Sequence, residues 1–486
     1  ATELTVATGP STDLTLTMDG DKGALLQVAG NLELDVFGFV QLEGSFAIEK
    51  SSGEVTLADT DGAGGADAEV VQVDRLLIGA TVSSAFAGIN GGTDDALGLE
   101  LTDVEFAMAL QTDKANVARS WTSLQASVGS AAFVGVEGLT VEVTTLGINV
   151  NQTSVLNGAV IDYSAGATEL TVATGPSTDL TLTMDGDKGA LIQAVGHLKI
   201  DLFGFVMIEG DLAFEKSSTT VTLQNLPSTP ADESATPVNV DVLTIGANDF
   251  SVFAGINGGT DDAVGLELSD VDFALVLLSE KASVGGTPPA TPLRKWTSLQ
   301  ATAGSVGFVG IDEFTLSAQD ISIQLNRSSV VNGPVVDYSA SNLEVITGAS
   351  SSITLDMDGD DGAVTRVAIG RATLAISDFV YISGGLYFEQ SSGQQVDVVT
   401  NLPNNPTALS SISTSLNKVQ GLSADKSRIE NLAVATTMFS ATDVDIFVGL
   451  GPYFIDENDN GLFDADEELN DDALGVTLDN IDLGVV

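Results

Sequence analysis

The chain has no cysteine among its 486 residues, and it has a single histidine. The lack of cysteine excludes disulfides, thiolate zinc sites and cysteine nucleophiles. The histidine, His197, stands where the equivalent repeat positions hold Asn31 and Arg371. We therefore interpret His197 as a surface variant of a repeated position. The parts needed for nucleophilic or general-base catalysis are missing, and we expect no enzymatic activity.

Basic residues are also scarce, with 17 lysines and arginines against 68 acidic residues and a net charge of −51. Nucleic acids and anionic membranes require a basic surface, so both are excluded as main partners. Such charge opposes compaction unless salt or cations compensate it. Solubility in salty water and the binding of divalent cations both explain it. No apolar run approaches the roughly 20 residues of a membrane span, so no transmembrane segment is expected.

Internal repeats are the main feature of the sequence. The opening sequence ATELTVATGPSTDLTLTMDGDKGAL returns unchanged at Ala167, and it returns in degenerate form from Leu343. These returns define three repeat units, residues 1–166, 167–339 and 340–486, the last one divergent and truncated. We expect both ends of the chain to be cuts through a longer tandem array.

A phrase of Phe, Val or Ala, any residue and an aliphatic residue recurs eight times, at Phe39, Phe86, Phe133, Phe205, Phe253, Phe308, Phe379 and Phe447. After five of these copies, two runs of alternating apolar residues flank a polar pair: Thr102-Asp103, Thr144-Thr145, Ser269-Asp270, Gln319-Asp320 and Asp479-Asn480. Alternation indicates a strand with one apolar face. The polar pair shifts the phase by one, which requires a bend. Since no pair contains glycine, a corner of a coiling sheet is favoured over a tight hairpin.

The predicted fold class is therefore all-β, with an elongated tandem-repeat architecture. A β-solenoid or β-helix is favoured, because 47 residues separate Phe39, Phe86 and Phe133 in turn. Tandem β-sandwiches or a barrel remain alternatives. The segments 408–420 and 427–439 are the only plausible short helices.

The sharpest motif is DENDNGLFDADE, residues 456–467. It matches the twelve-residue calcium loop, whose turn glycine is Gly461. The predicted Ca²⁺ ligands are Asp456, Asn458, Asn460, the carbonyl of Leu462, Asp464 and Glu467. The loop resembles that of an EF-hand, although helices are not expected on both sides of it.

Weaker candidate metal ligands repeat with the units. One group follows the opening sequence and another follows a glycine-rich turn: Asp19, Asp21, Asp185, Asp187, Asp358 and Asp360, then Asp94, Asp95, Asp261 and Asp262. Adjacent carboxylates repel one another unless solvent or a cation neutralises them. Solvated turns that bind nothing are the alternative.

Two further repeated features bear on sugars. Trp121 and Trp296 each open the sequence WTSLQA, and we expect them to anchor a core or a joint between units; a sugar-binding platform is the alternative. Asn151 and Asn326 begin glycosylation-type sequons at equivalent positions. Chance and repetition account for both sequons.

The phrases GFVxLEGxFAxEKS, AFAGINGG, GLELTDVEFAMAL, RSWTSLQA and VVDYSA resemble repeats of very large bacterial extracellular proteins. Such proteins are acidic, cysteine-free, calcium-loaded tandem arrays, similar to biofilm adhesins and other type I-secreted giants. The glycine-rich nonapeptide of RTX β-rolls is absent here. The resemblance implies a secreted or cell-surface location and a mechanical role.

We therefore expect a structural segment of a giant extracellular protein, a calcium-rigidified stalk, filament or surface fibre in adhesion or matrix. Its partners would be neighbouring repeats or copies of itself, with surface glycans as a further possibility. One alternative is a self-assembling surface-layer or filament subunit, and another is a carbohydrate-binding or carbohydrate-active β-helix.

Overall fold

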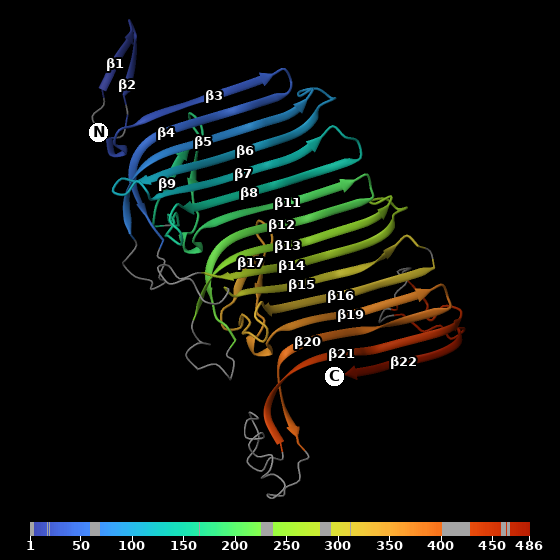
Figure 1. Cartoon of the computed structure of the whole chain (residues 1–486). Coiled ribbons are helices and arrows are strands. Elements are labelled where there is room, and N and C mark those ends of the chain that lie inside the picture. The colour runs from blue at the N-terminus through green and yellow to red at the C-terminus, as the bar shows by residue number, and fades with distance from the viewer. Residues whose placement is uncertain are drawn as a thin grey trace, which may run out of the picture.

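The computed structural model describes residues 4–486 apart from 17, 19, 59–68, 165, 225–236, 282–292, 312, 401–427, 458–462 and 464–466. The described residues form strands and three short 3₁₀ turns, with no α-helix among them. The prediction of an all-β protein is confirmed. Figure 1 shows the strands side by side in one broad, twisted sheet, with small hairpins at one end of the strands.

The elements recur in the same order in each repeat unit. Unit one contains β1 (Leu4–Gly9), β2 (Thr12–Leu16), η1 (Gly20–Lys22), β3 (Leu26–Val36), β4 (Val40–Thr56), β5 (Val70–Ile89), β6 (Leu97–Asp113), β7 (Ser120–Val134) and β8 (Leu139–Thr153). Unit two contains β9 (Leu170–Ala173), β10 (Asp179–Leu182), η2 (Gly186–Lys188), β11 (Leu191–Leu202), β12 (Val206–Val221), β13 (Val238–Ile256), β14 (Val264–Glu280), β15 (Lys295–Val309) and β16 (Phe314–Ser328). Unit three contains β17 (Leu343–Ile346), β18 (Ser352–Leu355), η3 (Gly359–Asp361), β19 (Val364–Ile376), β20 (Val380–Val399), β21 (Arg428–Leu450) and β22 (Leu474–Val485).

Sixteen strands, β3 to β8, β11 to β16 and β19 to β22, form a single antiparallel sheet in chain order. The remaining strands form three separate two-stranded hairpins, β1–β2, β9–β10 and β17–β18. The sheet is an open meander that runs through all three repeat units. Neither the coils of a solenoid nor a closed barrel is found among the described residues, so the finer prediction of a β-solenoid is not confirmed.

The polar pairs predicted to mark bends lie inside single strands. The second residue of each pair has a left-handed backbone: Asp103 (φ 50°), Thr145 (φ 50°), Asp270 (φ 51°), Asp320 (φ 53°) and Asn480 (φ 54°). The expectation of a bend is confirmed, but the expected corner between two strands is wrong. Asp and Asn tolerate this conformation best among residues with a side chain. One such residue restores the phase, so the apolar side chains on both sides of it keep to one face.

The recurrent phenylalanine phrase gathers at the end of the sheet opposite the hairpins. In β5, the Phe86 ring lies so close to Gly88 and Gly91 that a Cβ at either would come within 2.8 Å of it. Phe253 has the same relation to Gly255 and Gly258 in unit two. The ring covers backbone that glycine leaves bare, which explains why Phe and Gly repeat together.

The two larger hydrophobic cores are each built from two successive repeat units. Hairpin β9–β10 supplies Leu170, Val172 and Leu182 to a core whose other members include Val73 and Trp121 of unit one. Hairpin β17–β18 supplies Val345 and Leu355 to the equivalent core under Trp296 of unit two. The hairpin lies very close to the sheet, since a Cβ at Gly79 would meet the carbonyl oxygen of Ala173 at 2.2 Å.

A buried polar network fixes each joint between units. The hydroxyl of Tyr163 donates to Ser123 Oγ (2.8 Å) and accepts from Gln111 Nε2 (2.8 Å). Ser123 Oγ then donates to Asn151 Oδ1 (3.2 Å), whose amide nitrogen donates to the carbonyl of Ile161 (2.7 Å). Burial raises the pKa of Tyr163 to about 12, so its hydroxyl is protonated at neutral pH. These bonds stabilise the joint because the groups are removed from water.

The predicted helix at 427–439 is wrong, because β21 begins at Arg428 and continues through Leu450. Its residues pair with β20 from Arg428 opposite Val399 to Val448 opposite Val380. Tertiary pairing overrides a weak local helix preference here. The other predicted helix, 408–420, lies outside the described residues.

A Tyr163→Phe variant tests the joint network. Removing the hydroxyl leaves Gln111 and Ser123 short of a buried partner, so we expect a loss of about 1–3 kcal/mol in the free energy of unfolding of this region. Urea denaturation measures the loss.

Tyr338→Phe is the matched control, because Tyr338 bonds to Ser298 in the same way. Leu278 stands opposite Trp296, whereas Gln111 occupies the equivalent position opposite Trp121. Tyr338 therefore has no glutamine amide that would lose its hydrogen-bond partner. We expect Tyr338→Phe to be the milder change. An equal or larger loss for Tyr338→Phe would contradict this account.

Candidate functional site

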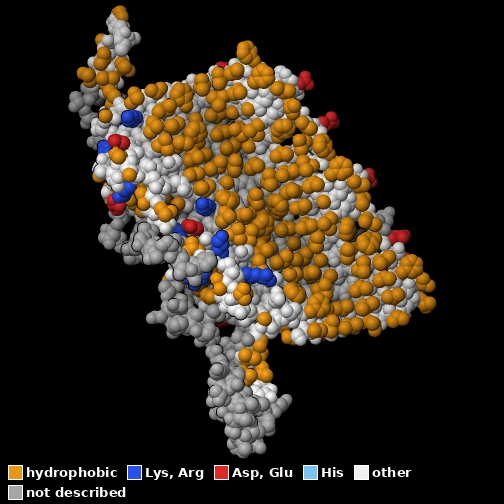
Figure 2. Space-filling model, viewed as in Figure 1, with side chains coloured by type: hydrophobic (Ala, Val, Ile, Leu, Met, Phe, Trp, Pro, Cys, Tyr) orange, Lys and Arg blue, Asp and Glu red, His pale blue; other side chains and the backbone are white. Residues whose placement is uncertain are grey.

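One face of the sheet is apolar across most of its width. Cross-strand partners join residues from fourteen strands, β3 to β20, into an unbroken row that we name the long row: Val36, Val40, Ala87, Leu99, Phe133, Val141, Ile200, Ile208, Val252, Leu268, Val306, Ala318, Ala372 and Gly384. All of these residues are exposed or half-buried. Figure 2 shows hydrophobic side chains over nearly the whole of the sheet face in view.

A second row runs parallel to the long row on the same face. It crosses twelve strands and alternates small and bulky residues over the first eight, after which all members are bulky: Gly30, Phe46, Ala80, Phe106, Ala126, Ile148, Ala194, Phe214, Ile245, Leu275, Leu299 and Leu325. Val40 and Phe46 lie on one face because β4 alternates without a register shift against β3. We name the area spanned by these two rows the apolar face. Exposed apolar patches on monomers rarely exceed a few hundred Å².

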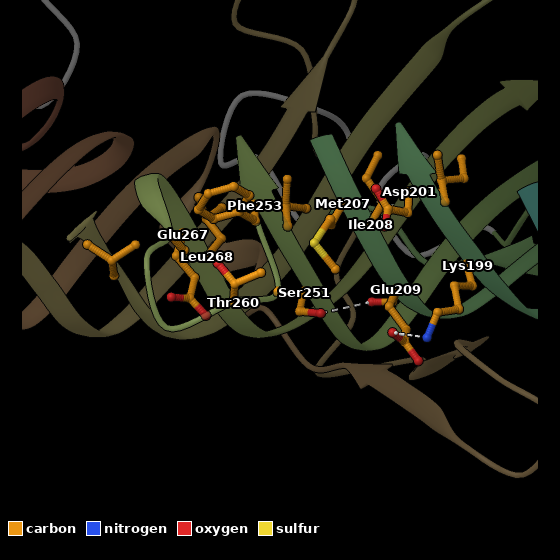
Figure 3. Close-up of a pocket in the computed structure, with 15 residues that line it drawn as sticks. Lys199, Asp201, Met207, Ile208, Glu209, Ser251, Phe253, Thr260, Glu267 and Leu268 are labelled. Carbon is orange, nitrogen blue, oxygen red and sulfur yellow. Dashed lines mark hydrogen bonds and ion pairs between the residues drawn. The ribbon is translucent and has the colours of Figure 1, made fainter. Parts of the chain in front are cut away.

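The opposite face carries the hairpins and a row of charged residues. A hollow of about 290 Å³ on the molecule is lined by residues that include Lys199, Glu209, Phe253 and Glu267 (Figure 3). Lys199 Nζ pairs with Glu209 Oε2 at 3.0 Å, and Ser251 Oγ donates to the Glu209 carbonyl. The serine hydroxyl is therefore bonded to backbone. The hollow offers a paired charge and an aromatic floor.

The two outer strands have unpaired edges. Among the described strands, β3 pairs only with β4, and β22 pairs only with β21. The equivalents of β3 in the other units, β11 and β19, have a second partner, β8 and β16 respectively. An unpaired edge presents backbone donors and acceptors in a row that another strand can extend.

Hairpin β1–β2 stands apart from the sheet, whereas its sequence twin packs in a core. Leu4 is 59% exposed and Leu170 is 4% exposed. Val6 is 42% exposed, and its twin Val172 is 1% exposed. Figure 1 shows β1–β2 projecting beyond the first edge of the sheet. The same residues therefore occur once covered and once bare in one chain.

The predicted calcium loop is described only in part. Asn458, Asn460, Leu462 and Asp464 lie outside the described residues. Of the others, Glu467 is buried and its Oε1 accepts from the backbone nitrogen of Glu457 at 3.1 Å, which brings the two ends of the loop together. Asp456 is half-buried.

The loop rests on an aromatic cluster. Phe463 packs against Tyr453 and Phe454, with ring centroids 5.7 and 5.3 Å apart. Its backbone nitrogen donates to the Tyr381 hydroxyl (3.1 Å), and Arg371 donates to its carbonyl. These contacts hold the middle of the loop against β19 and β20. Phe463, the eighth residue of the motif, therefore anchors the loop by apolar packing.

Two of the weaker aspartates cap short 3₁₀ turns. Asp185 and Asp358 accept from the backbone nitrogens of Asp187 and Asp360 at 2.9 Å, which caps η2 and η3. Asp94, Asp95, Asp261 and Asp262 are exposed in turns. Asp19 lies outside the described residues, and the side chain of Asp21 is not described. No group of three or more possible metal-binding side chains is found in the part of the chain that the structure describes.

The two tryptophans and the two sequon asparagines are all buried in the folded chain. Trp121 and Trp296 are buried, and their indole nitrogens donate to the carbonyls of Ala159 (3.0 Å) and Pro334 (2.9 Å). The prediction of core anchors is confirmed, and these rings offer no sugar platform. Asn151 and Asn326 are fully buried and hydrogen-bonded, so the folded chain offers no glycan acceptor at either.

Sequence reasoning missed the apolar face and the bare hairpin. The signal for the face was present, because alternating strands in every unit carry polar residues on one parity and aliphatic residues on the other. A two-layer fold would have covered that parity, and nothing in the sequence distinguishes a covered strand from an open one. The bare hairpin becomes visible only when two identical sequences are compared in one structure.

The histidine supplies a pH-dependent contact. His197 Nδ1 lies 2.9 Å from Asp211 Oδ1, and Nε2 lies 3.6 Å from Glu209 Oε1. The hydrogen bond to Asp211, aided by Glu209, raises the pKa of His197. Its contribution to stability is therefore complete below the unfolded pKa of about 6.5 and is lost as pH rises through the folded pKa.

We expect the melting midpoint to fall slightly as pH rises through that window. His197→Asn, which installs the residue of unit one, should remove this part of the pH dependence. Because the chain has one histidine, NMR titration of its ring proton measures the folded pKa directly. A folded pKa at or below that of a free histidine would contradict the assignment.

Comparison with protein-family models, characterised proteins and solved structures finds no match. No helix in the described part of the chain is long and apolar enough to cross a membrane.

Proposed function

We propose that the chain is a non-enzymatic structural repeat segment of an extracellular scaffold, a stalk or surface fibre stiffened by calcium. The observation that carries the proposal is how repeat units join. Strand β11 pairs with β8 from Leu191 opposite Asn151 to Leu202 opposite Leu139. Strand β19 pairs with β16 over the same extent, from Val364 opposite Asn326 to Ile376 opposite Phe314. Each junction is as extensive as the shorter pairings within a unit, such as that of β3 with β4.

A second contact locks each junction. The hairpin that opens a unit closes the core of the preceding one, and the joint tyrosine is buried between them. Successive units are therefore related by the same pairing and the same lock. Such nearest-neighbour stacking is how repeat proteins extend in one dimension. We infer that this chain serves as an elongated spacer and carries no reaction centre.

The acidic composition and the motif at 456–467 support calcium binding and an extracellular location of the protein. Net charge of −51 disfavours compaction unless cations compensate it. Calcium bound in the loop would tie Asp456 to Glu467 above the aromatic cluster and so fix the connection between β21 and β22.

A second candidate is a self-assembling surface-layer or filament subunit. It is favoured by the bare β1–β2 hairpin and the unpaired edge of β3, which together repeat the surface that β9–β10 and β11 present to unit one. Strand addition from another molecule would use the same backbone groups. Electron microscopy of the isolated chain distinguishes the candidates, because a subunit forms fibres or lattices and a spacer stays a single rod.

An extended chain with residues 1–166 duplicated ahead of Ala1 tests the proposed junction. We expect β1–β2 to pack on the added unit and its amide exchange to slow by at least about tenfold, since buried and paired amides open less often. Hydrogen exchange with mass spectrometry measures this. Hairpin β9–β10 in the same sample is the internal control, and unchanged exchange in β1–β2 would refute the junction.

Calcium binding is tested by thermal melts with calcium and with EGTA. A ligand that binds only the folded state stabilises it by about 3 kcal/mol at a hundredfold excess over Kd, so the midpoint of the last unit should fall on chelation. Glu467→Gln should abolish the shift.

Glu468→Gln is the matched control for this loop. It removes the next carboxylate along the chain, which is exposed and outside the twelve-residue motif, and should keep the shift. A melt insensitive to EGTA in the unaltered chain would remove calcium from the proposal.

A further inference from the structure

The apolar face is larger than stable protein interfaces require. Its long row crosses fourteen strands, so it spans about 60 Å at roughly 4.8 Å per strand. The second row lies six residues further along β4, about 20 Å away at roughly 3.3 Å per residue. The two rows therefore bound about 1,200 Å² on one copy and about 2,400 Å² on two. A standard interface buries about 1,600 Å² in total.

The charge distribution selects what can cover this face. Neither row contains a charged residue, although the chain carries a net charge of −51. The charges on the same side of the sheet, such as Lys50 and Lys216, lie beyond the second row toward the hairpin end of the strands. Between the rows, the charged residues lie on the opposite face, in a row that includes Asp35, Glu100, Glu142 and Glu209. Two copies placed apolar face to apolar face turn these charges away from each other. An anionic lipid surface would instead repel the chain as a whole.

The relief of the face suits another sheet. In the second row, Phe46, Phe106 and Ile148 alternate with Gly30, Ala80 and Ala126, which gives ridges and hollows at the spacing of the strands. Packed sheets interdigitate side chains in this way, at a separation of about 10 Å. No segment in the described part of the chain lies over the face. The chain's own sheet has the required width, relief and lack of charge.

We infer that the apolar face binds the same face of a second copy, so that two chains form a two-layered sandwich with both acidic faces outward. The contact is isologous, because each copy offers the same surface. The inference rests neither on calcium nor on the joining of repeat units end to end. Sedimentation velocity of the full chain therefore tests it separately, and we expect a dimer in the nanomolar to micromolar range.

The dimer should strengthen with ionic strength, because salt screens the repulsion between two acidic molecules while leaving the apolar contact intact. A Leu99→Lys/Val141→Lys double variant places two charges in the long row, at positions already exposed in the single chain. We expect its dissociation constant to rise at least about tenfold, as burying unpaired charge opposes association. Glu100→Lys/Thr140→Lys, at the neighbouring residues on the opposite face, should dimerise like the parent chain.

Thiol labelling gives a second readout that leaves the fold intact. The natural chain has no cysteine, so Val141→Cys and Thr140→Cys each carry a single thiol. In the dimer, the thiol at 141 should react several-fold more slowly than the thiol at 140, and the difference should vanish on dilution to monomer.

Three results would overturn the inference. The first is a chain that stays monomeric throughout this range, including one that instead binds neutral lipid vesicles through the apolar face. The second is a dimer that the lysines at 99 and 141 leave unchanged. The third is equal labelling of the two thiols at a concentration where the dimer predominates.

Discussion

The structure depends on one packing interaction, the docking of each opening hairpin on the sheet of the unit before it. A single-layered sheet cannot bury both of its faces, and the described strands have no second sheet over them. The hairpin covers the hydrophobic end of β4 to β7, where Val73 and Trp121 lie, and leaves the rest of the strands open. The molecule is therefore two-layered at one end of its strands and one-layered at the other.

The sequence was a good guide to everything that depends on local period. Alternation predicted strands, the polar pairs predicted bends, and repetition predicted three equivalent units. The left-handed residue at Asp103 and its equivalents could not be foreseen as a mid-strand bend, because a corner and a bend require the same phase slip. The strand topology could not be predicted for a similar reason, because the coils of a solenoid and an antiparallel meander can be formed by strands with the same sequence pattern.

The candidate sites also divide into those that a local sequence pattern predicts and those that depend on the whole fold. The calcium motif is a local pattern of spacing, and it can be read without a fold. Trp121 and His197 could be assigned from their repeat positions alone, and the structure places the first in a core and the second in a half-buried contact with Asp211. The apolar face is a collective property of fourteen strands. No window of sequence contains it, because it exists only once β3 to β20 have been set in register.

The shared cores also set an order of events in time. Strands β3 to β8 pair with chain neighbours, so the sheet can grow one hairpin after another with short loop closures. The core under Trp121, however, stays open until Leu170 to Met184 arrive from the following unit. A chain emerging from a ribosome or a secretion channel thus completes each unit one hairpin late. During emergence, the core formed last therefore stays incomplete until the hairpin of the next unit packs on it.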